Sequence, residues 1–514
     1  MTDSSANGDS FQLTVYSPSF REPNNWCGGI IYQIFPDRFY NSGKKRKNIP
    51  PDRILRTDWG ATPHFLPDEH GQIVNNDYFG GDLEGIREKL GYLKELGVSA
   101  LYLNPIFEAH SNHRYNTADY MKIDPLLGTE KDFINLCGDA KKLGIRIILD
   151  GVFSHTGSDS LYFNRECRYP VTGAANSTES PYFPWYDFSH WPDRYTSWWG
   201  IDTLPAVNEL CPSYMAFICG EGGVIDTWMN RGADGFRLDV ADELPDEFIA
   251  EIRKAVKRHG DDKLLIGEVW EDASNKISYG VRRKYLTGSE LDSVMNYPFK
   301  DAVLRFARYG NSEEFQNQVL TIVEHYPAPA LNTAMNSLST HDTARAITML
   351  AGADGTGKDR LWQAIHSLSP EDYRLGVKRL KLAMVLQYFL PGIPCIYYGD
   401  EAGLQGYTDP FNRGCYPWGH QQEELLTFAK ELGKIRLSCP VLSKGDLRFI
   451  DTPADVVGFL RRDRLHQVLV LVNSIDTSVS FALNEALSGF SPLSGNLQNG
   501  IIHLEPYGYA ILKK

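Results

Sequence analysis

Short apolar runs, each followed by a stretch with helical spacing, recur along the chain and constrain its fold more than any other feature. The runs are rich in β-branched and aromatic residues, whereas stretches such as DEFIAEIRKAVKRH (246–259) carry apolar residues at helical intervals. The eight runs are GGIIYQIF (28–35), SALYLNPIF (99–107), IRIILDGVF (145–153), GADGFRLDV (232–240), KLLIGEVW (263–270), LDSVMNYP (291–298), AMNSLSTH (334–341) and IPCIYYGD (393–400). Strands that are apolar throughout and alternate with helices predict a parallel sheet covered by helices.

The number of these units indicates a closed barrel. Eight consecutive strand–helix units are the count that closes a (β/α)₈ TIM barrel, in which the helices form an outer ring around the sheet. The same alternation also fits an open, doubly wound sheet, and that architecture is the alternative. We therefore predict an α/β fold with a TIM barrel at its centre.

Two parts of the chain depart from this alternation. The stretch 156–215 is too long for one helix and two loops and lacks sustained periodicity, which predicts a domain inserted after the third strand. After about residue 440, short alternating runs separated by turn residues predict a small antiparallel β-sandwich. We accordingly assign 1–155 and 216–439 to the barrel, 156–215 to the insertion and 440–514 to the C-terminal β-domain.

The charge and hydropathy of the chain exclude several classes of partner. The chain contains 52 Lys and Arg residues against 65 Asp and Glu residues, a formal net charge of −13, which argues against binding to nucleic acid. No stretch approaches the roughly 18 apolar residues of a membrane span. The N-terminal MTDSSANGDSFQLTVYSPSF has no basic region followed by an apolar run, so we expect a cytoplasmic protein without a membrane anchor.

Ionisable side chains cluster where the predicted strands end. Arg237 and Asp239 end the fourth strand, Glu268 the fifth and Asp342 the seventh. One such residue is usually a cap or half of a salt bridge, but three carboxylates at one barrel mouth repel one another and stabilise nothing. Glycoside hydrolysis needs this arrangement: one carboxylate attacks the anomeric carbon, a protonated second donates to the leaving oxygen, and a third stabilises the cationic transition state.

Four segments at these strand ends resemble the signature segments of the α-amylase family of glycoside hydrolases. They are DGVFSH (150–155), GFRLDVADE (235–243), GEVW (267–270) and STHDTAR (339–345). The resemblance covers nearly the whole chain in the same order and implies the barrel, an inserted domain B and a C-terminal β-domain. It implies that Asp239 is the nucleophile, Glu268 the general acid/base and Asp342 the transition-state stabiliser.

The same resemblance implies a set of sugar-binding side chains. NPIFEAHSNHRYNTADY (104–120) is similar to the second-strand region of the family, and DPFNR (409–413) is similar to the segment that grips the next glucose. The substrate-binding residues implied in this way are His113, Tyr115, His155, Arg237, His341, Asp409 and Arg413.

Two further segments resemble one branch of the family. VADE (240–243) and LPAVN (204–208) look most like the neopullulanase, cyclomaltodextrinase and maltogenic amylase branch. Common α-amylases carry a Lys-His pair where this chain has Asp242 and Glu243. The resemblance therefore implies a maltodextrin-type α-glucan substrate, with pullulan and cyclodextrins as related substrates.

The chain differs from that branch at its N-terminus. Members of the branch typically carry an N-terminal β-domain that builds a dimer and roofs the cleft, whereas only about 25 residues precede the first strand here. We therefore expect an open cleft, and a monomer in place of a domain-swapped dimer.

Two positions at which relatives bind calcium lack the usual ligands. The loop YNSGKKRKN (40–48) holds four cationic side chains where calcium-binding relatives are rich in Asp and Asn, although hard cations need oxygen ligands. We expect a solvated basic loop there, with an ammonium group in the place of the cation as the alternative. At the second position, Ser154 stands where an asparagine usually precedes His155, and Glu243 replaces a histidine. We therefore expect no metal and no cofactor.

An aromatic group in the insertion leaves two interpretations open. These side chains could stack on glucose rings or could pack the small inserted domain, in which buried rings would form much of the core. They are Trp185, Tyr186, Phe188, Trp198 and Trp199.

Three functions fit these residues. The first is a retaining hydrolase of α-1,4-glucosidic bonds, and the second is a 4-α-glucanotransferase that passes the same covalent intermediate to a sugar acceptor. The third, a non-catalytic glucan-binding relative, predicts the loss of at least one carboxylate, but Asp239, Glu268 and Asp342 are all present. An open cleft favours water as the acceptor, and we therefore predict the hydrolase.

Overall fold

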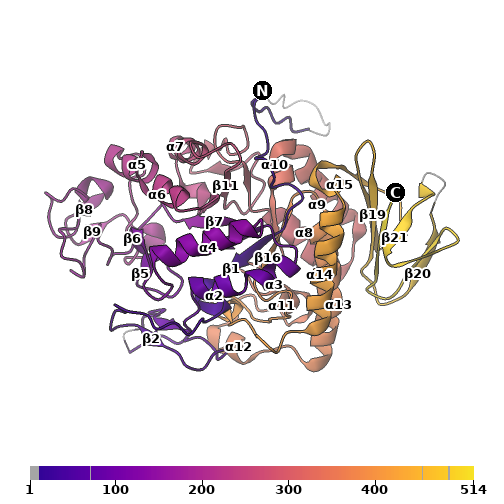
Figure 1. The fold of residues 1–514 in the computed structure, drawn as a ribbon, viewed down its shortest axis with the longest axis horizontal. Coiled ribbons are helices and arrows are strands. Elements are labelled where there is room, and N and C mark those ends of the chain that lie inside the picture. The colour runs from indigo at the N-terminus through magenta and orange to yellow at the C-terminus, as the bar shows by residue number, and fades with distance from the viewer. Residues whose placement is uncertain (1–10, 70, 454, 484–486) are drawn as a thin grey trace.

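A single eight-stranded parallel sheet forms the centre of the computed structural model, which describes residues 11–69, 71–453, 455–483 and 487–514 (Figure 1). Each predicted apolar run contains one strand of this sheet. In chain order the strands are β1 (Ile31–Ile34), β4 (Ala100–Leu103), β7 (Arg146–Gly151), β10 (Gly235–Leu238), β11 (Leu264–Gly267), β14 (Ser293–Val294), β15 (Met335–Ser337) and β16 (Ile393–Tyr397).

The sheet closes on itself. Strands that follow one another in the chain pair side by side, and β1 pairs with both β4 and β16, so the first and last strands are neighbours. Between β14 and β15 the ring is completed by a single parallel bridge that joins Met295 and Met335. This closure confirms the predicted (β/α)₈ TIM barrel and excludes the open, doubly wound sheet.

Helices cover the outside of the barrel. The main ones are α2 (Leu83–Glu88), α3 (Leu90–Glu95), α4 (Glu130–Lys142), α6 (Val224–Asn230), α7 (Asp246–Lys257), α8 (Tyr297–Tyr309), α9 (Ser312–His325), α10 (Ala328–Thr333), α13 (Pro370–Phe389) and α14 (Glu423–Ser438). Shorter ones are α1 (Pro36–Phe39), α11 (Ala346–Ala351), α12 (Arg360–Ile365) and α15 (Val441–Lys444). No helix in the described part of the chain combines the length and hydropathy that a membrane crossing requires.

The helical alternation fails at one connection. Between β11 and β14 the chain forms a short hairpin of β12 (Ile277–Ser278) and β13 (Val281–Arg282) in place of a helix. The sequence between the two strands has no stretch of sustained helical spacing, so the barrel is covered here by neighbouring helices alone.

Helix α4 illustrates how the sequence fixes the outer ring. The Thr129 side chain accepts a hydrogen bond from the backbone N–H of Asp132, whose carboxylate accepts one from the Thr129 N–H in return, so the helix begins at a capping box. Residues at helical spacing on its inner face are buried against the barrel: Phe133, Leu136, Cys137 and Ala140.

The strands are apolar on both faces because both faces are buried. Side chains that point into the barrel form one core, while those that point outward pack under the helices in a second, larger one. The inner core contains Ile31, Ala100, Tyr102, Ile148, Leu264, Ile266, Met295, Met335, Ile393 and Cys395.

The predicted insertion contains only short elements. They are η1 (Phe183–Trp185), β8 (Phe188–His190), β9 (Arg194–Tyr195) and η2 (Trp198–Gly200), and α5 (Pro212–Cys219) follows them. Trp185 and Tyr186 are buried, which favours the packing interpretation for these two rings. Trp199, in contrast, is exposed and lines a cavity that Trp198 also borders.

The C-terminal residues form two antiparallel sheets, as predicted. One contains β17 (Asp446–Phe449), β18 (Val456–Arg462), β19 (Gln467–Asn473), β24 (Tyr509–Lys513) and β21 (Ser491–Ser494), and the other β20 (Val479–Ala482), β23 (Ile501–Leu504) and β22 (Asn496–Gln498). Leu469 and Leu471 of the first sheet and Ile502 of the second share one core, so the sheets pack face to face. In Figure 1 this domain, in yellow, lies beside α13 and α14.

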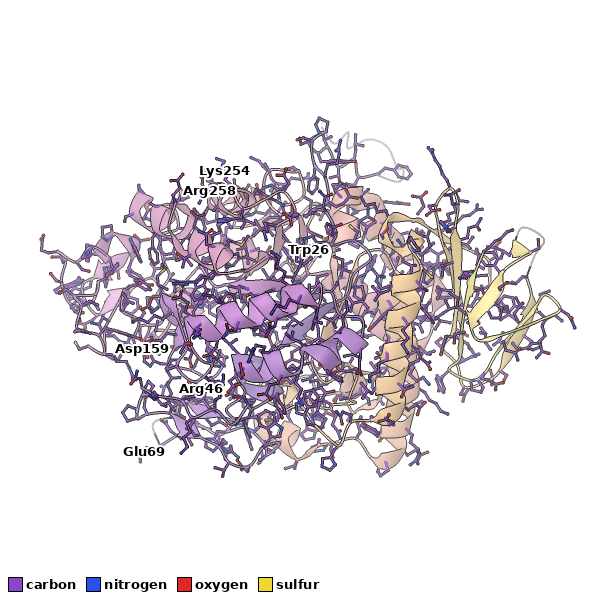
Figure 2. All side chains as sticks on the ribbon, in the orientation of Figure 1. Trp26, Arg46, Glu69, Asp159, Lys254 and Arg258 are labelled. Atoms are coloured by element: carbon purple, nitrogen blue, oxygen red, sulfur yellow. The ribbon has the colours of Figure 1, made fainter. Side chains whose placement is uncertain are left out.

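The basic loop after β1 is not uniformly solvated. Arg46, labelled in Figure 2, contacts the carboxylate of Asp82 at the start of α2 and lies 3.7 Å from Asp132 of α4. Lys44 lies 3.2 Å from Glu84 and 3.6 Å from Asp132. The prediction of a solvated loop is therefore wrong for Arg46, because acidic residues from two distant helices surround its guanidinium.

Candidate active site

A cavity of about 940 Å³ opens at the carboxyl ends of the barrel strands. Nine of the ten predicted site residues line it: His113, Tyr115, His155, Asp239, Glu268, His341, Asp342, Asp409 and Arg413. The tenth, Arg237, lies beneath the cavity floor and is completely buried. The closed barrel thus brings together residues that are up to 300 positions apart in the sequence.

Arg237 joins three carboxylates from three strands. Its Nη1 lies 2.7 Å from Asp150 Oδ1 and 2.8 Å from Asp239 Oδ1, and its Nη2 lies 2.8 Å from Glu268 Oε2. A guanidinium is planar and rigid, so it holds the oxygens that it contacts in a fixed arrangement. Asp239 and Glu268 therefore face the same part of the cavity, one at each terminal nitrogen of the Arg237 guanidinium.

The electrostatics of Asp239 reflect opposing influences. Burial raises the pKa of its carboxyl, the positive charge of Arg237 lowers it, and the nearby charges of Glu268 and Asp150 raise it again. The net result is a pKa of Asp239 well above its usual range, and Arg237, in direct contact with this carboxyl, is the group that opposes the shift.

Glu268 accepts contacts at both carboxylate oxygens. The backbone N–H of Val240 donates to Oε2 over 2.9 Å, and the indole N–H of Trp270 donates to Oε1 over 3.2 Å. Val240 has a φ of 40°, a left-handed conformation that is strained for a β-branched residue. The strained turn after the strand thus directs a backbone donor at Glu268.

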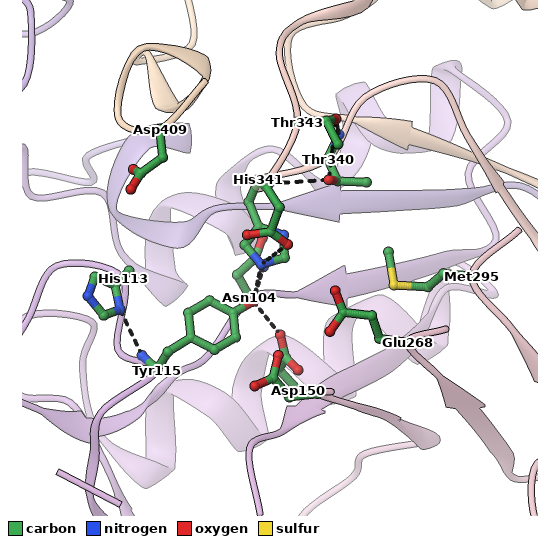
Figure 3. A network of polar contacts seen from close by, with 12 residues as sticks. Asn104, His113, Tyr115, Asp150, Glu268, Met295, Thr340, His341, Thr343 and Asp409 are labelled. Atoms are coloured by element: carbon green, nitrogen blue, oxygen red, sulfur yellow. Dashed lines mark hydrogen bonds and ion pairs between the residues drawn. The ribbon is translucent and has the colours of Figure 1, made fainter. Parts of the chain in front are cut away.

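Tyr115 and His341 form a stacked pair on the cavity wall (Figure 3). Their ring centroids are 5.1 Å apart with an interplanar angle of 4°, and the Tyr115 hydroxyl contacts His341 Nε2 and donates to Asp150 Oδ2 over 2.9 Å. Gln33 Nε2 donates to His341 Nδ1 over 3.0 Å. The proton of His341 therefore lies on Nε2, which is 3.1 Å from Asp342 Oδ2.

Asp409 and Arg413 form the end of the cavity that lies across His341 from Glu268. Their side chains pair at 2.9 Å, and Arg413 Nε donates to the backbone oxygen of His341 over 2.9 Å. In Figure 3, Asp409 and His113 lie on one side of His341, and Glu268 lies on the other. The cavity therefore extends from the Asp409 pair past the carboxylates to the residues that follow Glu268.

Sequence reasoning missed the polar residues that support this site. Asp150 marks the end of a predicted strand, but no role followed from that position, although it accepts hydrogen bonds from Tyr102 and Tyr115 as well as from Arg237. Gln33 and Asn104 are linked at 3.1 Å and hold His341 and Tyr115. A lone polar residue in or just after an apolar strand was the only signal available.

Comparison with known proteins identifies the family. Residues 33–436, about four fifths of the chain, match the model of the α-amylase catalytic domain. The chain belongs to the α-amylase family. An amylopullulanase from Thermoanaerobacter thermohydrosulfuricus is 38% identical over 88% of this chain, and this chain spans about a third of that relative's length. Neopullulanase 2 from Thermoactinomyces vulgaris is 33% identical, with 89% of this chain and 71% of the relative covered.

A solved structure from the α-amylase family has the same fold. The cyclic α-maltosyl-(1→6)-maltose hydrolase from Arthrobacter globiformis, in complex with that cyclic sugar, superimposes with a TM-score of 0.79 at 28% identity. The match covers 96% of this chain and 100% of that one. This similarity agrees with the predicted resemblance to the neopullulanase and cyclomaltodextrinase branch.

The described residues offer no evident metal site for this family member. Among them, no group of three or more His, Cys, Asp or Glu side chains is placed to hold a metal ion. Position 154 is a serine whose hydroxyl pairs with His155 Nδ1 at 2.9 Å. The absence of calcium stays a prediction.

The histidines of the site make the fold sensitive to acid. Burial lowers the pKa of His155 from 6.5 to about 4. Between these values the unfolded chain binds a proton that the folded chain does not, so the free energy of unfolding decreases as the pH falls through this window. The contribution of this one group is about 3 kcal/mol.

We expect His155→Gln to weaken this dependence. Urea unfolding of both proteins at pH 7 and pH 4.5 should show a loss of stability that is smaller in the variant by roughly 2 to 3 kcal/mol. Equal losses in the two proteins would contradict the assigned neutral histidine.

Proposed function

We propose that the protein hydrolyses α-1,4-glucosidic bonds of maltodextrins and related α-glucans with retention of anomeric configuration. The observation that carries this proposal is the placement of Asp239 and Glu268 at the two ends of the buried Arg237 guanidinium, facing one cavity. Retaining enzymes hold their two carboxyl groups about 5 to 5.5 Å apart, whereas inverting enzymes need roughly 6.5 to 9.5 Å for a water molecule. Contacts to a single guanidinium fit the shorter separation.

The reaction would proceed in two steps. Asp239 attacks the anomeric carbon while Glu268 gives its proton to the glycosidic oxygen, so the bond to the leaving sugar breaks and a covalent glucosyl-enzyme forms. Glu268, now ionised, then takes a proton from a water molecule, whose oxygen attacks the anomeric carbon from the face that the leaving sugar vacated and so displaces Asp239. Asp342, across the cavity, would stabilise the positive charge that develops on the sugar ring in both steps.

Contacts with Arg237, Val240 and Trp270 position the Glu268 carboxyl at the cavity wall. A sugar that fills the cavity would place its glycosidic oxygen within reach of this carboxyl, which would donate the proton that the leaving sugar needs. Tyr115, stacked on His341, and the Asp409–Arg413 pair would position the ring and the adjoining glucose.

The relatives support an α-glucan substrate. Those named amylopullulanase and neopullulanase take their names from pullulan, and the solved neighbour is a hydrolase of a cyclic maltosyl-maltose. We therefore place maltooligosaccharides, pullulan and cyclodextrins in the substrate range of this protein.

Product analysis tests the proposal. With maltoheptaose as substrate, we expect one new reducing end for each bond broken and the α-anomer as the first product in proton NMR. Bond cleavage without new reducing ends would identify a glucanotransferase, and an initial β-anomer would refute Asp239 as the nucleophile. Parallel reactions with pullulan and with a cyclodextrin would establish the substrate range.

A further inference from the structure

Two aromatic side chains in the active-site cavity are unusually open to solvent. Trp199, from the inserted domain, and Tyr279, from the β12–β13 hairpin, are each 76% exposed. Both line the cavity that contains Asp239 and Glu268. Isolated exposed apolar residues are common on protein surfaces, so their exposure alone assigns no role.

The backbone of Tyr279 adds a second, independent observation. Ser278 pairs with Val281 in the hairpin, and the two residues between them, Tyr279 and Gly280, have φ values of 50° and 77°. A two-residue loop with both φ values positive is a type I′ turn, whose first position favours Asn, Asp or Gly. The left-handed region is unfavourable for residues other than Gly, Asn and Asp, so the tyrosine does not suit the turn in which it stands.

Trp199 has the same unfavourable conformation. Its φ is 51°, and its ring stacks on Trp198 with centroids 5.1 Å apart. Its indole N–H donates to Glu243 Oε1 over 2.7 Å, which fixes the orientation of the exposed ring. Two strained, exposed aromatic residues from distant segments thus border one cavity.

Both segments are fastened to the turn that follows Asp239. Lys276, which precedes the hairpin, lies 3.0 Å from Asp242 Oδ2, and the Ser278 hydroxyl donates to the Asp242 backbone oxygen over 2.8 Å. The neighbouring Glu243 holds Trp199. Asp242 and Glu243 are therefore positioning residues that set the two rings relative to the strand end.

Tyr279 borders the leaving-group side of the cavity. The hairpin follows Glu268 in the same connection, and this side lies away from Asp409, as Figure 3 shows for Glu268. Because Glu268 would protonate the leaving oxygen, the departing chain must extend past the residues on this side.

We propose that Tyr279, together with Trp199, is a stacking platform for glucose residues of the leaving chain and of sugar acceptors. This inference rests on the proposed function and deepens it. The flat apolar faces of glucose fit exposed aromatic rings, and rings held in place by the fold lose little entropy on binding. Longer chains therefore gain binding energy that substrates with a small leaving group do not.

A comparison of two substrates tests the platform. Maltoheptaose places glucose residues on the leaving-group side, whereas α-maltosyl fluoride leaves only fluoride there. We expect Tyr279→Asn to lower kcat/KM for maltoheptaose about fivefold to tenfold and to leave that for α-maltosyl fluoride unchanged. The midpoint of thermal unfolding should stay the same or rise, because Asn suits the turn.

Two matched variants complete the experiment. Tyr279→Phe keeps the ring and should retain wild-type activity on both substrates, and Phe11→Asn removes a 90% exposed ring outside the cavity and should do the same. Equal losses on both substrates, or a fall in the unfolding midpoint with no substrate preference, would overturn the platform. If the wild-type protein consumes neither substrate, the proposed function fails and the platform fails with it.

Discussion

Asp239→Asn is expected to lower kcat on maltoheptaose by on the order of 10⁴-fold or more, because an amide cannot form the covalent intermediate. The folded state should not suffer. Three carboxylates surround Arg237, and removing one of the mutually repelling charges leaves the guanidinium paired with Asp150 and Glu268. Initial rates and the midpoint of thermal unfolding, measured on the same preparation, check both parts.

A second carboxylate variant separates the roles of the two groups. Glu268→Gln should lose activity on maltoheptaose but keep most of its glycosylation rate on α-maltosyl fluoride, because fluoride departs without a proton. Asp239→Asn should lose activity on both substrates. If Asp239→Asn turned over the fluoride at the wild-type rate, another group would be the nucleophile.

Arg237→Met is expected to produce the largest loss of stability of any single substitution in the site, about 3 to 5 kcal/mol. Methionine fills much of the same space, but it leaves Asp150, Asp239 and Glu268 without their shared cation in a buried setting. Denaturant unfolding at pH 7 measures this loss.

The pH dependence of that loss identifies its cause. Burial already raises the pKa values of Asp150 and Asp239, and removing the positive charge of Arg237 raises them further, so the folded variant binds extra protons and its deficit shrinks as the pH falls. Adding Asp150→Asn to Arg237→Met should restore part of the stability, because it removes one unpaired charge. A deficit below 1 kcal/mol that does not change with pH would show that Arg237 acts mainly through its volume.

The barrel could be predicted because its strands leave a local signal. Each is apolar on both faces, and that pattern does not depend on which strand becomes its neighbour. Closure could not be read in the same way, because it depends on a single bridge between Met295 and Met335. The prediction also assumed a helix before β14, because strands and helices alternate elsewhere in the barrel. The chain forms a hairpin there instead.

The candidate site was predictable where its residues carry charge at strand ends. Asp239, Glu268 and Asp342 stand out against apolar runs, and the barrel converts three separate positions into one cavity. Gln33 gave no such signal, because its contact with His341 joins residues 308 positions apart. The same holds for Arg46, whose acidic partners belong to helices that the loop reaches only in the folded chain.

The exposed rings show a different limit of sequence reasoning. Trp199 belonged to an aromatic group with two open interpretations, and only its burial and its contact with Glu243 separate it from Trp185. Tyr279 carries no signal in the sequence, because an isolated tyrosine before a glycine has no periodicity. Its significance depends on a backbone angle.

The contact between β14 and β15 is the shortest strand pairing in the barrel. One backbone bridge and a hydrogen bond between the Asn296 and Asn336 side chains join these strands, whereas β4 and β7 pair over four residues. Local opening of the barrel therefore costs less free energy here than between β4 and β7. Glu268 follows β11, which pairs with β14, and Asp342 follows β15. The two carboxylates therefore lie on opposite sides of the contact between β14 and β15. We expect that any local opening there would move Glu268 away from Asp342 and would leave Glu268 and Asp239 joined through Arg237.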